Sequence, residues 1–222
     1  MRRLLFVLAL PAVVLTTLAA GCSTTQPGPP AGPTVGTALD PAAADTAVFA
    51  GGCFWCMEKP FEELDGVYSV VSGFSGGDLP NPTYDQVASK QTNHYEVVEV
   101  IYDPAVVPYD TLLQVYWHNI DPLDDGGQFC DRGTPYRPAI FVRTDEERTK
   151  AERPKAFLDG RFSASVVVPI LDAAPFYAAE DYHQDFYRTT PRRYQQYRTG
   201  CRRDARLEQL WGDNAGTLGS AL

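Results

Sequence analysis

The stretch GGCFWCMEKPFEEL, residues 51–64, is the part of the sequence that best predicts the fold and the chemistry. The apolar run before it, TAVFA at residues 46–50, is typical of a strand. Two glycines then lead into a helix-like segment, so Cys53 is predicted at or near the first helical turn. The free N–H groups and positive dipole end of a helix favour a thiolate there. Because Cys56 follows one turn later on the same face, we predict a nucleophilic cysteine with a second thiol in reach.

The bulk composition indicates one medium-sized domain with a real core. The chain has 222 residues, of which 44% are hydrophobic and 12% aromatic. Its formal net charge is −9 at pH 7, and no basic patch stands out. Because phosphate binding needs clustered lysine and arginine, we expect no nucleic-acid partner.

Residues 1–21 have the parts of an export signal: two arginines, an apolar run and small residues. The run LAAGC, ending at Cys22, resembles the lipobox of bacterial lipoproteins, in which the cysteine becomes acylated. Leu18 lies four residues before Cys22 instead of the usual three, and an ordinary cleaved signal peptide is the alternative. Residues 22–44, rich in Pro, Gly, Thr and Ala, are typical of a flexible tether. We therefore expect a cell-envelope protein outside the cytoplasm, lipid-anchored to a membrane, or else secreted or periplasmic and soluble.

Four cysteines remain beyond Cys22, and they could form two structural disulfides in an oxidising compartment. However, the pair Cys53 and Cys56 is only three residues apart and would close almost no loop, so its disulfide would stabilise little. That spacing favours redox chemistry. The other two cysteines, Cys130 and Cys201, lie much further along the chain.

The remaining chain alternates strand and helix patterns, which indicates an α+β domain. Strands are predicted at residues 46–50, 67–75, 96–102, 139–144 and 165–171, and helices at residues 84–89, 109–119, 145–159, 180–188, 191–197 and 206–211. The long glycine-rich loop at residues 121–137 is a candidate for function and lacks the ligand pattern of a calcium loop. Residues 212–222 are expected to be a disordered tail.

Glu96 begins the predicted strand at residues 96–102, on the same face as Val98 and Val100. If that face is buried, desolvation raises the pKa of this carboxyl toward neutrality, as a proton donor requires. A solvated glutamate at a frayed strand end is the alternative.

Taken together, five motifs resemble the methionine sulfoxide reductase A family over residues 46–211. They are GGCFWCMEKPFEEL, NPTYDQV, HYEVVEVIYDP, QFCDRGTPYRPAIF and AEDYHQDFY, in the order of the family. The resemblance implies one catalytic domain at residues 45–211, a two-layer α+β sandwich around a mixed sheet. It also implies reduction of the S epimer of methionine sulfoxide, free or in oxidised proteins, by a monomer that binds no cofactor or metal and is recycled by a thioredoxin-like dithiol.

A sulfoxide sulfur is electrophilic only when its oxygen is protonated or strongly hydrogen-bonded, so the site needs an acid and donors. The resemblance implies that Glu96 supplies the proton, that Tyr84 and Tyr136 hold the oxygen, and that Asp131 orders the polar network. Cys53 then attacks sulfur and becomes a sulfenic acid. The resemblance further implies that the two aromatic residues of the motif, Phe54 and Trp55, contact the methyl group of the substrate.

Members of the family that have GCFWC are expected to resolve the sulfenic acid through Cys56. Helix geometry permits this, because Cα atoms three residues apart lie about 5 Å from each other. Cys201 is the alternative, as a second relay thiol or a direct rival. We expect Cys130 to be a bystander beside Asp131, with a bond to Cys201 as the other possibility.

Three other functions share part of this sequence pattern. A thioredoxin-type oxidoreductase also has a strand, CxxC and a helix, but the tyrosine and glutamate motifs then have no explanation. A structural zinc site is disfavoured, because a lone CxxC with two distant cysteines is poor ligand spacing. A non-catalytic lipoprotein that binds a ligand in an aromatic pocket would lack sulfoxide turnover.

Overall fold

The computed structural model describes residues 43–216. The expected export signal at residues 1–21, Cys22 and nearly all of the tether lie outside this range, as does the end of the tail from residue 217. Within residues 43–216, none of the helices is both long and apolar enough to cross a bilayer.

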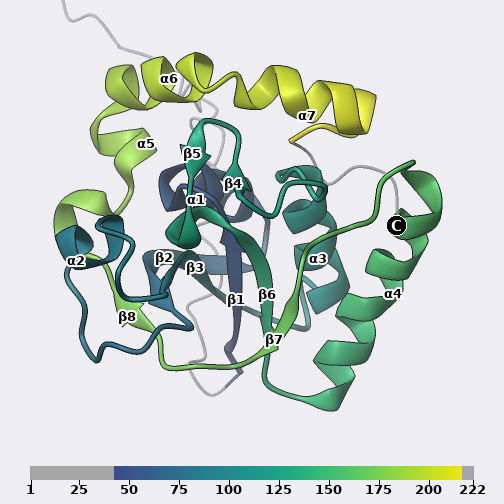
Figure 1. Ribbon diagram of the computed structural model, residues 1–222. Helices are drawn as coiled ribbons and strands as arrows, with labels where there is room; N and C mark the ends of the chain where they lie inside the picture. Colours follow the sequence, from purple (N-terminus) through teal and green to yellow (C-terminus); the bar gives the residue numbers. More distant parts are fainter. Residues whose placement is uncertain (1–42, 217–222) are drawn as a thin grey trace, which may run out of the picture. The chain divides into compact units, whose positions relative to one another are not determined.

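A mixed six-stranded sheet forms the centre of the domain (Figure 1). Its strand order is β7-β6-β1-β3-β2-β8, and all neighbours are antiparallel except β6 and β7, which are parallel. The strands are β1 (Asp45–Gly51), β2 (Val67–Ser75), β3 (Tyr95–Tyr102), β6 (Pro138–Val142), β7 (Ile170–Asp172) and β8 (Tyr177–Ala178). The predicted mixed sheet is confirmed.

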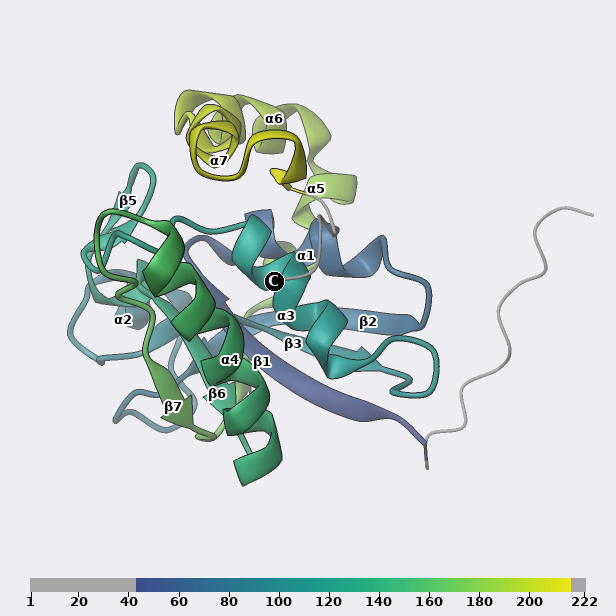
Figure 2. The ribbon, with the colours of Figure 1, turned by 90° about the vertical axis from the view of Figure 1, so that its right-hand side faces the viewer.

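Three helices cover one face of this sheet and form the second layer (Figure 2). They are α1 (Phe54–Glu62), α3 (Tyr109–His118) and α4 (Asp145–Arg161). Between the layers lies the main core, in which Phe49 and Val98 of the sheet pack with Phe61, Leu113 and Leu158 of the helices. Alternate strand residues turn to the opposite face, where a smaller cluster forms. The predicted two-layer α+β architecture is thus confirmed.

The C-terminal segment lies above α1 (Figure 1). It comprises α5 (Phe186–Thr189), α6 (Pro191–Gly200) and α7 (Arg203–Trp211), followed by the 3-10 turn η3 (Gly212–Asn214). Cys56 of α1 packs against Phe186 and Tyr194 of this segment. The segment therefore forms a roof over the second thiol of the motif.

Several boundaries differ from the sequence prediction. The helix predicted at residues 180–188 is broken into η2 (Asp181–His183) and α5, because Asp185 adopts a left-handed conformation with φ of 51°. The strand predicted at residues 165–171 shrinks to β7, since Pro169 cannot donate a ladder hydrogen bond. Residues 212–216, predicted to belong to a disordered tail, are ordered: η3 spans Gly212–Asn214, and the N–H of Gly216 donates to the carbonyl of His118.

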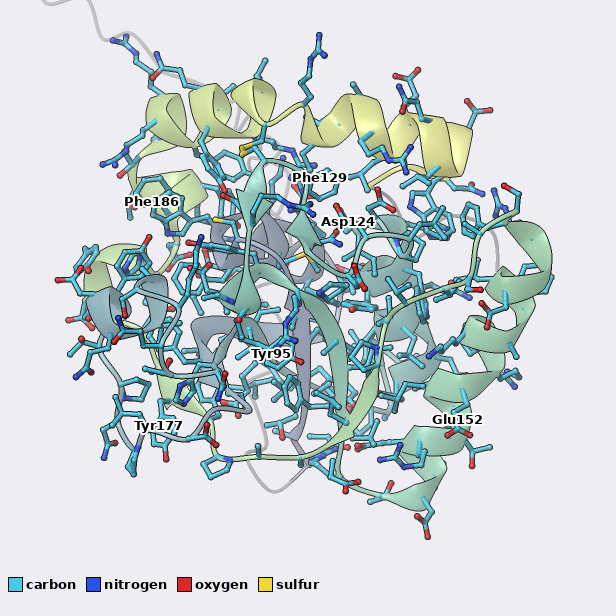
Figure 3. The ribbon with its side chains drawn as sticks, viewed as in Figure 1. Tyr95, Asp124, Phe129, Glu152, Tyr177 and Phe186 are labelled. Carbon is cyan, nitrogen blue, oxygen red and sulfur yellow. A yellow bond between two sulfur atoms is a disulfide. The ribbon has the colours of Figure 1, made fainter. Side chains whose placement is uncertain are left out.

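The functional loop predicted at residues 121–137 contains a small hairpin. Strands β4 (Gly127–Gln128) and β5 (Asp131–Arg132) are antiparallel, and the 3-10 turn η1 (Thr134–Tyr136) follows. At the tip of the hairpin, Phe129 has a φ of 55° and lies under the C-terminal helices (Figure 3). This hairpin brings residues 131–137, DRGTPYR, to the start of α1.

Candidate active site

The turn between β1 and α1 places Cys53 at the N-cap of the helix, as predicted. Gly52, just before it, has a φ of 83°, and a Cβ there would lie 2.5 Å from Cβ of Gln128. Both the backbone conformation and the lack of space require glycine. The strand end and the glycine turn therefore fix where the Cys53 thiol points.

Cys53 and Cys56 are free thiols in a buried pair, 5% and 1% exposed. Burial, the hydrogen bond with Cys56 and the nearby Glu96 and Asp131 raise the pKa of Cys53. In contrast, the hydrogen bond from Cys53 and two arginines of the C-terminal segment lower the pKa of Cys56 to about 7. The helix N-terminus was expected to favour a thiolate at Cys53. Instead, burial raises the pKa of the Cys53 thiol and keeps it protonated at rest, and the thiolate of the pair is favoured at Cys56.

Glu96 is buried at the start of β3, with 2% exposure. Its Oε2 accepts a hydrogen bond from the backbone N–H of Phe54, with a distance of 3.1 Å. This N–H is the first of α1, so the helix end binds the carboxyl group instead of the Cys53 sulfur. Burial raises the pKa of Glu96 to about 8, and Asp131 and Cys56 add to the rise. The predicted buried carboxyl is confirmed, and it is protonated at neutral pH.

The two tyrosines predicted for the site, Tyr84 and Tyr136, lie near Glu96 and Cys53. Burial raises the pKa of Tyr84 to about 12, and the neighbouring Glu96 and Cys53 add to this. Burial likewise raises the pKa of Tyr136, and the charges of Glu96 and Tyr84 add to this. Tyr84 and Tyr136 thus remain neutral donors beside the acid and the nucleophile.

The two aromatic residues of the motif form an apolar wall with the ring of His183. Phe54 is buried, with its ring centroid 5.0 Å from that of His183 and 6.5 Å from that of Tyr84. Trp55 is half-buried, and its Nε1 donates to Nδ1 of His183 at 3.1 Å. The Trp55 ring also stacks on Phe186 at 3.8 Å. His183 therefore orients the wall that the sequence predicted from Phe54 and Trp55.

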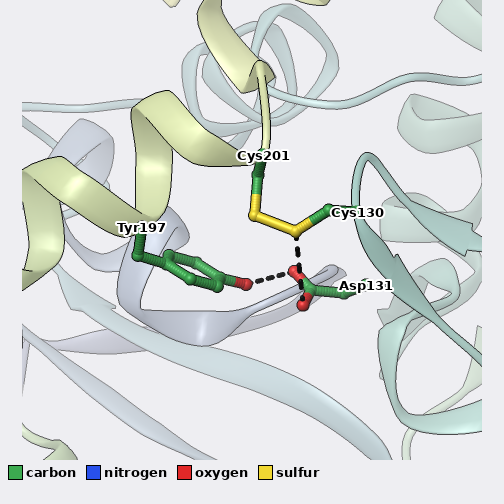
Figure 4. Close-up of a disulfide and its surroundings, with 4 residues drawn as sticks. All are labelled: Cys130, Asp131, Tyr197 and Cys201. Carbon is green, nitrogen blue, oxygen red and sulfur yellow. Dashed lines mark hydrogen bonds between the residues drawn. A yellow bond between two sulfur atoms is a disulfide. The ribbon is translucent and has the colours of Figure 1, made fainter.

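Asp131 and Tyr197 link the hairpin to the C-terminal roof (Figure 4). The Tyr197 hydroxyl donates to Oδ2 of Asp131. Burial raises the pKa of Tyr197, as do the neighbouring Cys53 and Asp131. Tyr197 thus reaches both the nucleophile and the carboxylate that was expected to order the polar network. Sequence analysis missed Tyr197, because the motif QQYRTGC carries no sign of which helix face turns inward.

Cys130 and Cys201 form a disulfide, with Cα atoms 4.8 Å apart (Figure 4). The expectation that Cys130 is a bystander is therefore wrong. The hairpin tip and the end of α6 are brought into contact, since Tyr197 of the same helix binds Asp131 beside Cys130. The zinc site considered from the sequence does not fit, because two of its four thiols are bonded to each other. Cys201 is also not a free thiol in this state.

Comparisons with known proteins agree with this site. The sequence model of the peptide methionine sulfoxide reductase family matches residues 45–215. The peptide methionine sulfoxide reductase MsrA of Bacillus licheniformis is 51% identical over 170 residues, which cover 76% of this chain and 94% of that protein. MsrA 2 of Caulobacter vibrioides is 51% identical over 176 residues, which cover 79% of this chain and 89% of that protein.

Solved structures give the same result. Methionine sulfoxide reductase A of Corynebacterium diphtheriae has a TM-score of 0.62 and 34% identity, covering 67% of this chain and 76% of that one. Mxr1 from Saccharomyces cerevisiae in reduced form has a TM-score of 0.65 and 28% identity, covering 69% and 89%.

A buried thiol pair beside a carboxyl whose pKa is raised, on a two-layer α+β domain, supplies the nucleophile and the acid that a cysteine-dependent reductase needs. The sequence and structure matches show that the chain belongs to the peptide methionine sulfoxide reductase A family. Its activity is the reduction of methionine sulfoxide to methionine. The thioredoxin-type alternative considered from the sequence is thereby set aside.

Proposed function

We propose that Cys53 attacks the sulfur of methionine sulfoxide while Glu96 protonates the sulfoxide oxygen. The observation that carries this proposal is the buried Glu96 carboxyl, which touches the first N–H of the helix that Cys53 caps. Its pKa of about 8 keeps it protonated at neutral pH. The attack joins the Cys53 sulfur to the substrate sulfur. This bond and the S–O bond of the substrate then break as the hydroxyl group passes to the Cys53 sulfur, so that methionine leaves and Cys53 is a sulfenic acid. The thiol proton of Cys53 restores Glu96, so atoms and charges balance.

The arrangement of donors and wall supports selection of the S epimer. Tyr84 and Tyr136 both lie near Glu96, and their hydroxyl groups form the proposed site for the sulfoxide oxygen. Phe54 and Trp55 form a fixed apolar wall for the methyl group. Because sulfoxide sulfur is chiral, one site for oxygen and one for methyl accept a single epimer. Both free and peptide-bound methionine sulfoxide are proposed substrates.

Cys56 is the proposed resolving thiol. It lies one turn after Cys53 and shares a hydrogen bond with it, and its pKa of about 7 provides thiolate at neutral pH. Attack on the sulfenic acid forms the Cys53–Cys56 disulfide and releases water. Cys201, the alternative, is engaged with Cys130. It can compete only after that disulfide has been reduced.

A thioredoxin-like dithiol is the proposed reductant, with the chain acting as a monomer that carries no bound cofactor. Cys53 and Cys56 are almost completely buried under the C-terminal roof, so a protein reductant must reach them through a movement of that roof or through Cys130, which is exposed. Reduction of a disulfide takes two electrons and two protons, which the dithiol of the proposed partner supplies as it is itself oxidised to a disulfide.

We also propose export and lipid anchoring through Cys22. Its support is the sequence of residues 1–22, which has the parts of a lipoprotein signal. Cells that express the full chain and are fed radiolabelled palmitate should yield labelled protein in the membrane fraction. Cys22→Ser should remove the label, and labelling that survives this change would contradict the proposal.

The activity is tested with purified protein, dithiothreitol and a racemic mixture of free methionine sulfoxide. We expect the S epimer to disappear and the R epimer to remain. Consumption of both epimers would contradict the proposed oxygen and methyl sites. Insulin disulfide reduction without sulfoxide turnover would support a thioredoxin-like function instead.

A further inference from the structure

The short helix α2 (Tyr84–Ala88) carries Tyr84, a residue of the proposed site for the sulfoxide oxygen. It has five residues, of which Val87 alone is buried, with 1% exposure. Its side-chain cap comes from Thr83, which is exposed. An isolated helix of this length is not stable in water. The position of Tyr84 therefore depends on contacts between α2 and other parts of the fold.

Glu180, 96 residues further along the chain, makes such a contact. Its Oε1 accepts a hydrogen bond from the backbone N–H of Tyr84, with a distance of 3.0 Å. This N–H is the first of α2, so it has no acceptor within the helix itself. The other carboxylate oxygen, Oε2, is buried and has no hydrogen-bond partner among the described residues. Within residues 43–216, the Tyr84 N–H is therefore the only donor that this carboxylate contacts.

Glu180 also connects Tyr84 to the apolar wall. Its backbone carbonyl accepts the N–H of His183 at 2.9 Å, across the 3-10 turn η2 that Glu180 precedes. The ring centroid of His183 lies 4.4 Å from that of Tyr84, and its Nδ1 accepts from Nε1 of Trp55 at 3.1 Å. One residue thus links the helix that carries an oxygen donor to the wall proposed for the methyl group.

The segment that contains Glu180 is itself fixed to the central sheet. Oε1 of Gln184 accepts from the N–H of Ser72, and its Nε2 donates to the carbonyl of Ser72, each at 2.9 Å. The N–H of Ala179 donates to the same carbonyl at 2.9 Å. Ser72 lies on β2 and is buried. Glu180 therefore lies between two residues that are anchored to a buried strand, and it can hold α2 in place.

We propose that Glu180 is a positioning residue for sulfoxide reduction, because its carboxylate holds Tyr84 at a fixed place relative to the Trp55 ring. The inference rests on the proposed role of the Tyr84 hydroxyl as a donor to the sulfoxide oxygen. Such a donor is effective only when it is held at hydrogen-bond distance from the oxygen during the reaction. Without the Glu180 contact, α2 shifts and the attack by Cys53 slows, whereas the wall that binds the methyl group remains.

Glu180→Leu and Glu180→Gln test the contact as a matched pair. Glutamine keeps an oxygen that can accept from the Tyr84 N–H, whereas leucine has no acceptor. Single-turnover methionine formation is measured over a range of S-epimer concentrations. In Glu180→Leu the maximal rate should fall about tenfold, the effect of one hydrogen bond to a charged group, with little change in the half-saturating concentration. Glu180→Gln should stay within about threefold of wild type. Wild-type rates in Glu180→Leu would overturn the inference.

A double-mutant cycle with Tyr84→Phe separates positioning from a general structural role. If Glu180 acts through the Tyr84 hydroxyl, Glu180→Leu should slow methionine formation no further in Tyr84→Phe protein. Losses that multiply in the double variant would show that Glu180 supports the fold in another way, and would overturn the inference. A wild-type rate in Tyr84→Phe alone would instead remove the proposed oxygen donor, and the inference with it.

Thr83→Val is the control for the stability of α2. It removes the side-chain oxygen that accepts from the Gln86 N–H at the start of the same helix, but it leaves the Glu180 contact in place. The maximal rate should change by less than about twofold. Equal slowing in Thr83→Val and Glu180→Leu would show that only the stability of the helix matters, which contradicts the inference.

Amide hydrogen exchange in the wild type tests the contact itself, in case Glu180→Leu fails to fold. The first N–H of a helix exchanges readily with solvent unless a group outside the helix accepts it. We expect the Tyr84 N–H to exchange many times more slowly than the same amide in an unfolded peptide. Exchange at the unfolded rate would show that Glu180 does not hold α2, and would overturn the inference.

Discussion

Glu96 shows how one residue acquires a chemical role from its surroundings. It lies near the start of a strand whose face is covered by α1, so its carboxyl is desolvated, and the one backbone donor that it contacts among residues 43–216 is the Phe54 N–H. A single hydrogen bond does not offset burial, and the pKa stays near 8. The same group in water would be ionised and unable to donate a proton at neutral pH.

Glu96→Gln tests this assignment through its pH dependence. Because wild-type Glu96 loses its proton as the pH rises through about 8, the rate of methionine formation should fall above that pH. The glutamine variant should be slower by about two to four orders of magnitude, and its rate should not fall above pH 8. Single-turnover methionine formation from pH 6 to 10 measures both. A glutamine variant that keeps the falling limb would exclude Glu96 as the acid.

Glu58 is a second buried carboxyl, away from the reacting atoms. Its Oε1 accepts from Ser72 Oγ at 2.9 Å, whereas its Oε2 has no partner among the described residues. Burial raises the pKa of Glu58 to about 7. A carboxyl with a raised folded pKa stabilises the fold at low pH and loses this contribution as the pH rises from about 5 to 8.

Glu58→Gln should therefore be more stable than wild type at pH 8, by up to about 3 kcal/mol, and nearly equal to it at pH 5. Urea unfolding at the two pH values measures this difference. Glu63→Gln, an exposed change at the end of the same helix, should shift neither value by more than about 0.5 kcal/mol. A Glu58→Gln free energy of unfolding that parallels wild type would contradict the raised pKa.

At the scale of elements, three consecutive residues of the β4–β5 turn bind the C-terminal helices. The ring of Phe129 lies under Arg203, Cys130 is bonded to Cys201, and Asp131 accepts from Tyr197. The hairpin and the roof therefore form one unit over the two free thiols.

Cys130→Ser should weaken this unit without touching the reacting atoms. The disulfide joins positions 71 residues apart, and in the chain-entropy account a loop of that length contributes about 4 kcal/mol at most. Thermal unfolding should show a lower midpoint, while single-turnover methionine formation persists. Wild-type protein with dithiothreitol should approach the midpoint of the variant. Equal midpoints with and without reductant would show that the disulfide does not stabilise the roof.

Tyr197→Phe removes the hydroxyl that reaches Asp131 and Cys53. We expect methionine formation to slow by about tenfold, the loss of one hydrogen bond to a charged group. Tyr187→Phe is the matched control, because it removes a tyrosine–carboxylate hydrogen bond to Glu62 on the outer side of α1. Equal rates in the two variants would mean that Tyr197 only packs.

For the whole molecule, the features that could be predicted from the sequence are those encoded within one contiguous motif. Cys53 at a helix start and Glu96 on a buried strand face follow from local spacing, and both are confirmed as positions. Tyr197 and Arg203 could not be predicted, since their partners Asp131 and Gly51 lie 66 and 152 residues away and meet them only after the roof has folded. The two-residue strand β8 also lacks a pattern long enough to detect.

The central claim is that Cys53 reduces methionine sulfoxide and that Cys56 closes the cycle. The most direct measurement is a single turnover without reductant, on protein whose Cys130–Cys201 disulfide is intact, followed by non-reducing peptide mapping. We predict about one methionine per chain, a peptide carrying the Cys53–Cys56 disulfide, and no methionine from Cys53→Ser. Methionine formation by Cys53→Ser, or a disulfide that joins Cys53 to Cys201 in the wild type, would contradict the account.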